Sequence, residues 1–247
     1  MARLDGVVAV ITGASSGIGE ATAETLAAEG ATVVVAARRE ERLSDLVERI
    51  AGNGGRTLSV PCDITDEGQA HALIRRTEEE FGRVDILVNN AGVMLLSKVE
   101  KGLSDQWRQM FDVNVLSLLY ATDAAIGVMK RQQSGHIVNI SSVAGLKVRT
   151  TGGVYSGTRF AVGAISEVLR MELQGDNIRV TVVEPGAVET ELQSQITDEE
   201  AKEGLSGLLS LDILQAEDIA NAIAYAVTQP ERVSVNEILI RPTQQPN

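Results

Sequence analysis

The sequence predicts an α/β fold, a doubly wound domain with a seven-stranded parallel sheet and helices on both faces. Seven short runs rich in Val and Ile alternate with helix-prone segments along the whole chain, which is typical of parallel strands joined by crossover helices. Aromatic residues make up only 3% of the sequence, so the core must be aliphatic, as in sheets buried on both faces. Neither a linker nor a repeat interrupts the pattern, so we expect a single domain over residues 1–247.

Charge and composition exclude several kinds of protein. The chain carries 34 acidic and 22 basic side chains, a net charge of −12, which argues against nucleic acid or an anionic membrane as a partner. Cys62 is the only cysteine, so no intramolecular disulfide can form and nothing indicates an oxidising compartment. No apolar run approaches about 18 residues, and no signal peptide is recognisable at the start. We therefore expect a cytoplasmic protein.

The unit at residues 7–30 organises the prediction of function. The apolar run at residues 7–11 predicts a buried strand, and residues 20–29 predict a helix that stops at Gly30. Between them, residues 12–19 form a turn with three glycines. A strand that turns sharply into a helix directs unpaired N–H groups and the positive end of the helix dipole at one point. That point suits a phosphate.

The three glycines have separate predicted roles. Gly13 permits the tight turn, Gly17 lets a pyrophosphate approach the backbone, and Gly19 lets the helix pack closely on the strand. Their spacing differs from the G-x-G-x-x-G dinucleotide fingerprint, and glycine turns without a ligand occur in many α/β proteins. The flanking strand and helix favour nucleotide binding over that alternative.

Arg38 and Arg39 follow the second predicted strand, Thr32–Ala37, and indicate the type of cofactor. Sites for NAD carry an acidic residue about 20 residues after the glycine turn, where it binds the ribose 2′-hydroxyl. An arginine in that place can pair with the 2′-phosphate of NADP(H) instead. The alternative is that both arginines are solvated charges at the start of the next helix. Their position at a strand end favours NADP(H).

The remaining elements follow in regular alternation. Strands are predicted at 56–61, 84–88, 136–141, 178–183 and 235–240, and helices at 42–50, 66–81, 104–131 with Ser104 as N-cap, 154–173 and 216–228. Asn89 to Gly92 (NNAG) follow the fourth strand, at the edge where open α/β sheets bind ligands. Residues 189–210 are polar and helix-prone, which is typical of a lid or substrate loop. Asn114, in an apolar segment, must be either a structural bridge or part of a site.

Three residues could carry acid–base chemistry. Tyr155 lies in the first turn of its predicted helix, and Arg159 follows one turn later on the same face. A positive neighbour favours the phenolate form of a tyrosine, and Ser142 at the preceding strand end could bind the same oxygen. The alternative is a packed tyrosine with surface stacking. His71 and His136 lack metal or triad spacing, so we expect no metal site.

Together these motifs resemble the short-chain dehydrogenase/reductase family. TGASSGIG at 12–19 matches its glycine motif, NNAG at 89–92 matches its second signature, and Asn114, Ser142, Tyr155 and Pro185-Gly186 follow in matching order and spacing. The resemblance covers nearly the whole chain. It implies a Rossmann fold and a carbonyl reductase type of oxidoreductase, which transfers hydride between NADP(H) and a carbonyl or secondary alcohol.

The resemblance also implies roles for the matching residues. Ser142 would position the carbonyl, Tyr155 would transfer the proton, and Asn114 would hold a water in the proton path. With Arg159, these form the implied catalytic set. The implied cofactor-binding residues, running from the phosphates and adenine to the nicotinamide, are Gly13, Ser15, Ser16, Gly17, Ile18, Gly19, Arg38, Arg39, Asp63, Ile64, Asn90, Ala91, Gly92, Tyr155, Arg159, Pro185, Gly186, Val188 and Thr190.

One residue departs from the family pattern. The family motif is Tyr-x-x-x-Lys, and this chain has Arg159 in the place of the lysine. In the family, the lysine holds the nicotinamide ribose, supports the tyrosine phenolate and passes a proton outward. Arginine can do the first two, but it does not readily release a proton. We expect proton resupply to run through water or the ribose hydroxyl.

Two alternatives remain beside the reductase. Arg159 favours an NADPH-binding sensor or interaction protein with weak or no turnover. A methyltransferase fits less well, because the paired arginines and the Ser/Tyr pair would have no role. Within the family, VMLL at 93–96 and EILIRPT at 237–243 resemble clavulanate dehydrogenase and related hydroxy-acid dehydrogenases. The family implies a homo-oligomer, a tetramer or dimer, formed through the helices at about 104–131 and 153–174, and residues 94–96 and 189–210 are expected to line the substrate pocket.

Overall fold

Seven parallel strands form the sheet of the structure, a computed structural model that describes residues 3–245. Their order is β3-β2-β1-β4-β5-β6-β7, and all neighbouring pairs are parallel. The strand order reverses between β1 and β4, and ligands of open α/β sheets bind at such a point. The predicted doubly wound fold is confirmed. The strands are β1 (Val8–Thr12), β2 (Thr32–Ala37), β3 (Arg56–Pro61), β4 (Ile86–Asn89), β5 (Gly135–Ile140), β6 (Ile178–Pro185) and β7 (Glu237–Ile240).

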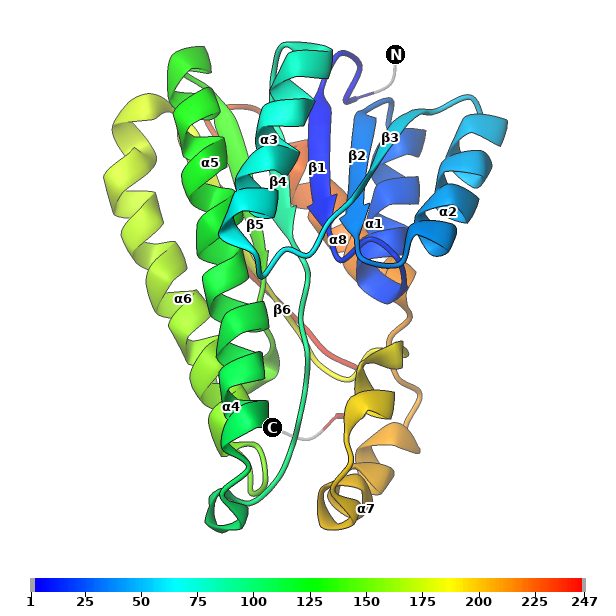
Figure 1. The fold of residues 1–247 in the computed structure, drawn as a ribbon, viewed down its shortest axis with the longest axis vertical. Coiled ribbons are helices and arrows are strands. Elements are labelled where there is room, and N and C mark those ends of the chain that lie inside the picture. The colour runs from blue at the N-terminus through cyan, green and yellow to red at the C-terminus, as the bar shows by residue number, and fades with distance from the viewer. Residues whose placement is uncertain (1–2, 246–247) are drawn as a thin grey trace.

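Helices cover both faces of this sheet (Figure 1). Helices α1, α2 and α8 pack on one face, and α3, α5 and α6 pack on the other. The short α4 precedes α5, and α7 lies beyond the carboxyl ends of the strands. The helices are α1 (Gly17–Ala28), α2 (Glu40–Gly52), α3 (Glu67–Phe81), α4 (Ser104–Phe111), α5 (Ser117–Gln132), α6 (Gly153–Leu173), α7 (Glu199–Leu209) and α8 (Ala216–Val227).

The core is aliphatic, as the scarcity of aromatic residues predicts. Alternate residues of a strand point to opposite faces, so Ile11 packs with α1 and α8 while its neighbour Val10 packs with α3 and α5. Both side chains are completely buried. Burying a side chain of this size contributes about 1.5–3 kcal/mol to folding. The sheet is therefore a rigid base for the loops at its carboxyl edge.

The helix predicted over residues 104–131 is interrupted. A π-helical turn, Asp112–Leu116, separates α4 from α5 and holds Asn114. Such turns insert one residue into a helix and are frequent at functional sites. The prediction of Ser104 as N-cap is wrong: Leu103 occupies that position, and Ser104 is the first helical residue. The Ser104 N–H bonds the carbonyl of Gly102, which turns the chain in a left-handed conformation.

The stretch Ser104–Gln132 is long and apolar enough to cross a membrane by length and composition. The stretch contains no continuous apolar run of that length, because polar residues interrupt it without ending the helix. In the structure, Ala121, Ala125 and Met129 of α5 are buried against the sheet. This packing is that of a core helix in a globular protein.

The segment predicted as a lid, residues 189–210, folds into a short 3₁₀ helix, Glu191–Gln195, followed by α7. Ile196, Ala201 and Leu205 of this segment pack against a third apolar cluster that includes Leu96 and Tyr155. Two basic side chains, Lys98 and Lys101, form ion pairs with acidic residues at the start of α7. The segment thus rests on the carboxyl edge of the sheet.

Candidate active site

A cleft of about 1140 Å³ opens at the carboxyl edge of the sheet. The lining of the cleft is positive although the chain as a whole is negative. Seven basic and only four acidic side chains line it. These are Arg38, Arg39, Arg108, Lys147, Arg149, Arg159 and Arg241, against Asp63, Asp105, Asp112 and Glu191. A positive cleft in an acidic protein concentrates anions. It suits a ligand that carries phosphate groups.

The cleft brings together most of the predicted site residues. Two of them, Gly19 and Asn114, lie behind its wall. The lining includes Gly13, Ser15, Ser16, Gly17, Ile18, Arg38, Arg39, Asp63, Ile64, Asn90, Ala91, Gly92, Ser142, Tyr155, Arg159, Pro185, Gly186, Val188 and Thr190. Met94 and Leu96 also line it, whereas Leu95, the residue between them, does not.

The glycine turn is fixed by the end of β4. Gly13 and Gly17 have φ angles of 65° and 57°, a left-handed conformation that favours glycine. The Asn90 side chain donates through Nδ2 to the Thr12 carbonyl at 2.9 Å and to the Gly13 carbonyl at 3.2 Å. A Cβ on Gly19 would collide with this Asn90 nitrogen and lie 2.5 Å from the Gly13 oxygen. Gly19 therefore serves packing, and Asn90 keeps only its amide oxygen for a ligand.

The start of α1 is open toward the cleft. Ser16 is the N-cap residue, and its side chain makes no capping hydrogen bond, so the first N–H groups of the helix have no side-chain acceptor among residues 3–245. Ser16 and Gly17 both line the cleft. This donor set fits the pyrophosphate of a dinucleotide.

Arg39 and Arg38 differ in their contacts. Arg39 binds Ser15, Ser16 and Glu191. Among residues 3–245, Arg38 makes no hydrogen bond or ion pair, and it faces the cleft near Asp63. The pKa of Asp63 is lowered, first by a hydrogen bond from Thr65 and also by the charge of Arg38.

Tyr155 and Arg159 form a buried pair. Their exposed fractions are 6% and 5%, and the Arg159 guanidinium carbon lies 5.0 Å from the centre of the Tyr155 ring. This is a cation–π contact in a desolvated place, where its strength is greatest. The predicted juxtaposition on one helix face is present, and burial excludes surface stacking. Within the described part of the chain, the Tyr155 hydroxyl makes no hydrogen bond, so it is available to a ligand.

Arg159 is fixed by the end of β5. Its Nη1 donates to the Ile140 carbonyl at 3.0 Å, while Nε is buried without a partner among residues 3–245. Its Nη2 lies against Gly92, where a Cβ would be only 2.7 Å away. Gly92 is thus a glycine because the guanidinium needs the space. The unpartnered nitrogens fit the hydroxyls of a ribose.

Ser142 and Asn114 hold the backbone around this pair. Ser142 Oγ donates to the Pro185 carbonyl at 3.4 Å and accepts from the Ala144 N–H at 3.1 Å. Asn114 donates to the Val93 carbonyl and to Thr158, and accepts from the Val93 N–H. Both hydrogens of its Nδ2 are used, so it is a structural bridge. Only its amide oxygen has a further lone pair for a water.

Three buried groups have shifted pKa values. Burial, and then Asp63, raise the pKa of the Cys62 thiol to about 11, so this thiol is unreactive at neutral pH. Burial, and then Arg179, lower the pKa of His136 to about 3. Burial, and then Glu237, raise the pKa of Glu184 to about 7. His136 and Glu184 do not line the cleft.

The sequence did not single out Lys147, Arg149 or Glu191, which also line the cleft. Arg149 donates to the Gly204 carbonyl of α7 at 3.1 Å. Glu191 binds Arg39, which is 152 positions away in the chain. The only feature of the sequence that pointed to Glu191 was its place in the predicted lid.

The fold and the cleft define an α/β protein built to hold a dinucleotide beside a tyrosine with a cationic partner. The chain belongs to the short chain dehydrogenase family, whose pattern matches residues 7–201. It is therefore an oxidoreductase of that family.

Individual relatives agree. An uncharacterized oxidoreductase of Staphylococcus saprophyticus is 45% identical over 241 residues, which cover 96% of each chain. A closed form of serine dehydrogenase complexed with NADP+ is 30% identical, with a TM-score of 0.90 over 98% of this chain and 97% of that one. An alcohol dehydrogenase of Thermococcus sibiricus complexed with 5-hydroxy-NADP is 26% identical, with a TM-score of 0.86 over 98% of both chains.

Proposed function

We propose that this protein transfers hydride between NADP(H) and a carbonyl or secondary alcohol, with Tyr155 as the general acid and base. The observation that carries the proposal is the buried Tyr155–Arg159 pair in the same cleft as the glycine turn. When bound, the nicotinamide supplies or accepts the hydride.

The residues of the chain perform the remaining work. In reduction, Tyr155 donates its hydroxyl proton to the carbonyl oxygen. The Ser142 hydroxyl gives up its long bond to the Pro185 carbonyl and donates its one hydrogen to the same substrate oxygen. The Arg159 cation over the ring stabilises the phenolate that remains. Because arginine does not release a proton, Tyr155 is reprotonated through water or a ribose hydroxyl. In oxidation, the phenolate takes the proton from the alcohol.

NADP(H) is the proposed cofactor. The end of β2 carries Arg38 and Arg39 where NAD sites carry an acid, and the serine dehydrogenase and alcohol dehydrogenase relatives were solved with NADP compounds. Arg159 supports ribose binding through its unpartnered nitrogens.

A small hydroxy acid, or the matching keto acid, is the proposed substrate class. Lys147 and Arg149 supply positive charge to the part of the cleft beside Ser142 and α7. The likeness of residues 93–96 and 237–243 to the clavulanate dehydrogenase group, and the serine dehydrogenase relative, support the same class. Residues 189–210 would close over this substrate.

A cytoplasmic homo-oligomer completes the proposal. Phe111, Leu116, Phe160, Val168 and Met171 expose apolar side chains on α4, α6 and the π-helical turn. These lie on the helices through which the family resemblance implies assembly. We place no nucleic acid or membrane among the partners.

The test is NADPH oxidation with a panel of keto acids, ketones and aldehydes, with NADH as the cofactor control. The proposal expects turnover with NADPH and a preference for keto acids. Tight NADPH binding without turnover, and activity only in Arg159→Lys, would favour instead a cofactor-binding sensor. Arg159 is the feature that supports this second candidate.

A further inference from the structure

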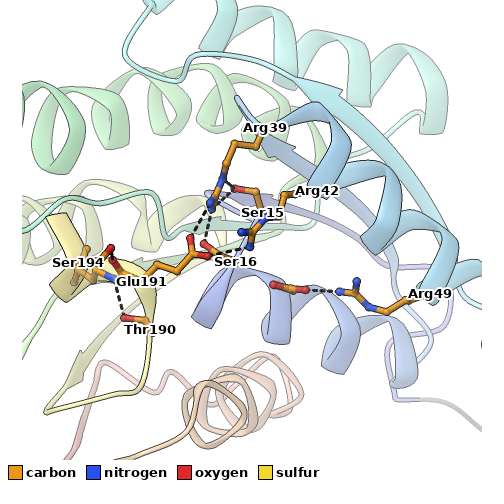
Figure 2. Close-up of polar contacts among 10 residues, drawn as sticks. Ser15, Ser16, Arg39, Arg42, Arg49, Thr190, Glu191 and Ser194 are labelled. Carbon is orange, nitrogen blue, oxygen red and sulfur yellow. Dashed lines mark hydrogen bonds and ion pairs between the residues drawn. The ribbon is translucent and has the colours of Figure 1, made fainter. Parts of the chain in front are cut away.

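Glu191 lies on the arginine that is proposed to bind the cofactor 2′-phosphate. Its Oε2 is 2.7 Å from Nη1 of Arg39, and its Oε1 is 3.0 Å from Nη1 of Arg42 (Figure 2). The other nitrogens of Arg39 bind the Ser15 hydroxyl at 3.0 and 3.1 Å and the Ser16 hydroxyl at 2.6 Å. All three guanidinium nitrogens of Arg39 thus have partners within the chain.

The position of Glu191 is set by the start of the lid segment. Thr190 precedes it, and the Thr190 methyl lies 3.1 Å from the place where a Cβ of Gly17 would be. Thr190 and Glu191 together join the lid segment to the glycine turn and to the end of β2. The Glu191 carboxylate is therefore held against Arg39 by charge, next to a residue whose side chain packs on the glycine turn.

We propose that Glu191 is a specificity-determining residue that competes internally with the 2′-phosphate of NADP(H) for Arg39. This inference rests on the proposed NADP(H) function. A phosphate monoester carries a charge of about −1.5 to −2, so it cannot share Arg39 with a carboxylate without strong repulsion. Glu191 must leave when the phosphate binds. NAD(H) has a hydroxyl in that place and does not compete with the carboxylate.

The competition is moderate in strength. Arg39, Arg42 and Glu191 have side chains about half exposed, and exposed ion pairs are weak. The phosphate, with its greater charge, replaces the carboxylate on Arg39. The affinity for NADP(H) is reduced, because the ion pairs of Glu191 with Arg39 and Arg42 must break first. Glu191 also couples cofactor binding to the base of the lid. Its carboxylate cannot stay on Arg39 when the 2′-phosphate is bound there, so binding of the phosphate releases this end of the lid segment.

The test compares Glu191→Gln with Glu189→Gln by calorimetric titration of NADP+, NAD+ and the fragments 2′,5′-ADP and ADP. Glu189 is in the same segment, but its carboxylate accepts from Gln215 at 3.0 Å. The control thus removes the same charge away from Arg39. We expect Glu191→Gln to bind NADP+ and 2′,5′-ADP about three- to tenfold more tightly, without tighter NAD+ or ADP binding. Glu189→Gln should match the wild type.

A second variant tests whether Glu191 acts through Arg39. In Arg39→Gln, NADP+ affinity should fall, and adding Glu191→Gln should restore none of it, because the two residues act as one unit. Unchanged or weaker NADP+ binding in Glu191→Gln would overturn the inference while leaving the proposed function intact. Failure of NADP+ to bind the wild type and every variant would overturn the proposed function itself.

Discussion

Replacing Arg159 tests whether a permanent cation can serve where the family has a lysine. Arg159→Lys keeps the charge but shortens the group, and Arg159→Met removes the charge at similar length. The account predicts that Arg159→Lys retains kcat within about tenfold, because the phenolate of Tyr155 still has a cationic neighbour. Arg159→Met should lose about 100-fold or more in kcat, since acid–base catalysis by a positioned group contributes about 10²–10⁴-fold.

The contacts of Arg159 also determine how much its replacement lowers the free energy of unfolding. Arg159 Nη1 donates a hydrogen bond to Ile140, and a bond from a charged group contributes about 1.5–3 kcal/mol. The buried contact with the Tyr155 ring adds about 2 kcal/mol. Arg159→Met should therefore lower the free energy of unfolding by about 3.5–5 kcal/mol, and Arg159→Lys by less.

Steady-state kinetics, direct NADPH binding and urea unfolding on the same samples separate these effects. Equal kcat in Arg159→Met and Arg159→Lys would refute a role for the charge. An inactive wild type beside an active Arg159→Lys would show that arginine impairs the site.

Three further predictions concern stability. His136 has a pKa near 3 instead of 6.5, so the unfolded chain binds a proton that the folded chain does not. The free energy of unfolding should thus fall as pH drops from 6.5 toward 3, by about 1.4 kcal/mol per pH unit. In His136→Gln this fall should be shallower. Equal slopes of stability against pH in the two proteins would contradict the prediction. Glu184 has a pKa near 7 instead of 4.5, so its contribution is present below pH 4.5 and lost as pH rises toward 7. Glu184→Gln should therefore be more stable than the wild type at pH 8, by about 1–3 kcal/mol, with little difference at pH 4.5; a gain equal at both pH values would be inconsistent with titration. Gly19→Ala should lower the free energy of unfolding by about 1–3 kcal/mol or more through overpacking against Asn90. The control Gly52→Ala, whose added Cβ would meet nothing within 4 Å among residues 3–245, should be neutral or stabilising. Similar melting temperatures for the two variants would refute the packing role of Gly19.

Local sequence patterns predicted most of the fold. Buried strands read as short aliphatic runs, and glycine or capping residues mark several helix ends, as when Asp66 caps α3 and Gly82 ends it in a left-handed conformation. The π-helical turn at Asn114 escaped prediction, because a one-residue insertion leaves the helical apolar pattern almost unchanged. It depends on the tertiary hydrogen bonds that Asn114 accepts from the Val93 N–H and donates to the Thr158 hydroxyl.

The candidate site could be predicted where neighbours are close in sequence or follow strand ends. Tyr155 and Arg159 are one helical turn apart, so their contact follows from helix geometry. The pairing of Glu191 with Arg39 depends on how the lid crosses the glycine turn, which no local pattern encodes. The donors of Asn90 and Asn114 likewise bind backbone carbonyls that only the folded chain brings close.

The most direct test of the account is deuterium transfer from NADPH deuterated at both C4 positions to the carbonyl substrate, followed by mass spectrometry, in the wild type and in Tyr155→Phe. The account predicts deuterium at the new carbinol carbon with the wild type. It predicts a rate at least about 100-fold lower with Tyr155→Phe at saturating NADPH. Transfer at the same rate in both proteins would contradict the assignment of Tyr155, and NADPH-dependent reduction without deuterium in the product would contradict hydride transfer itself.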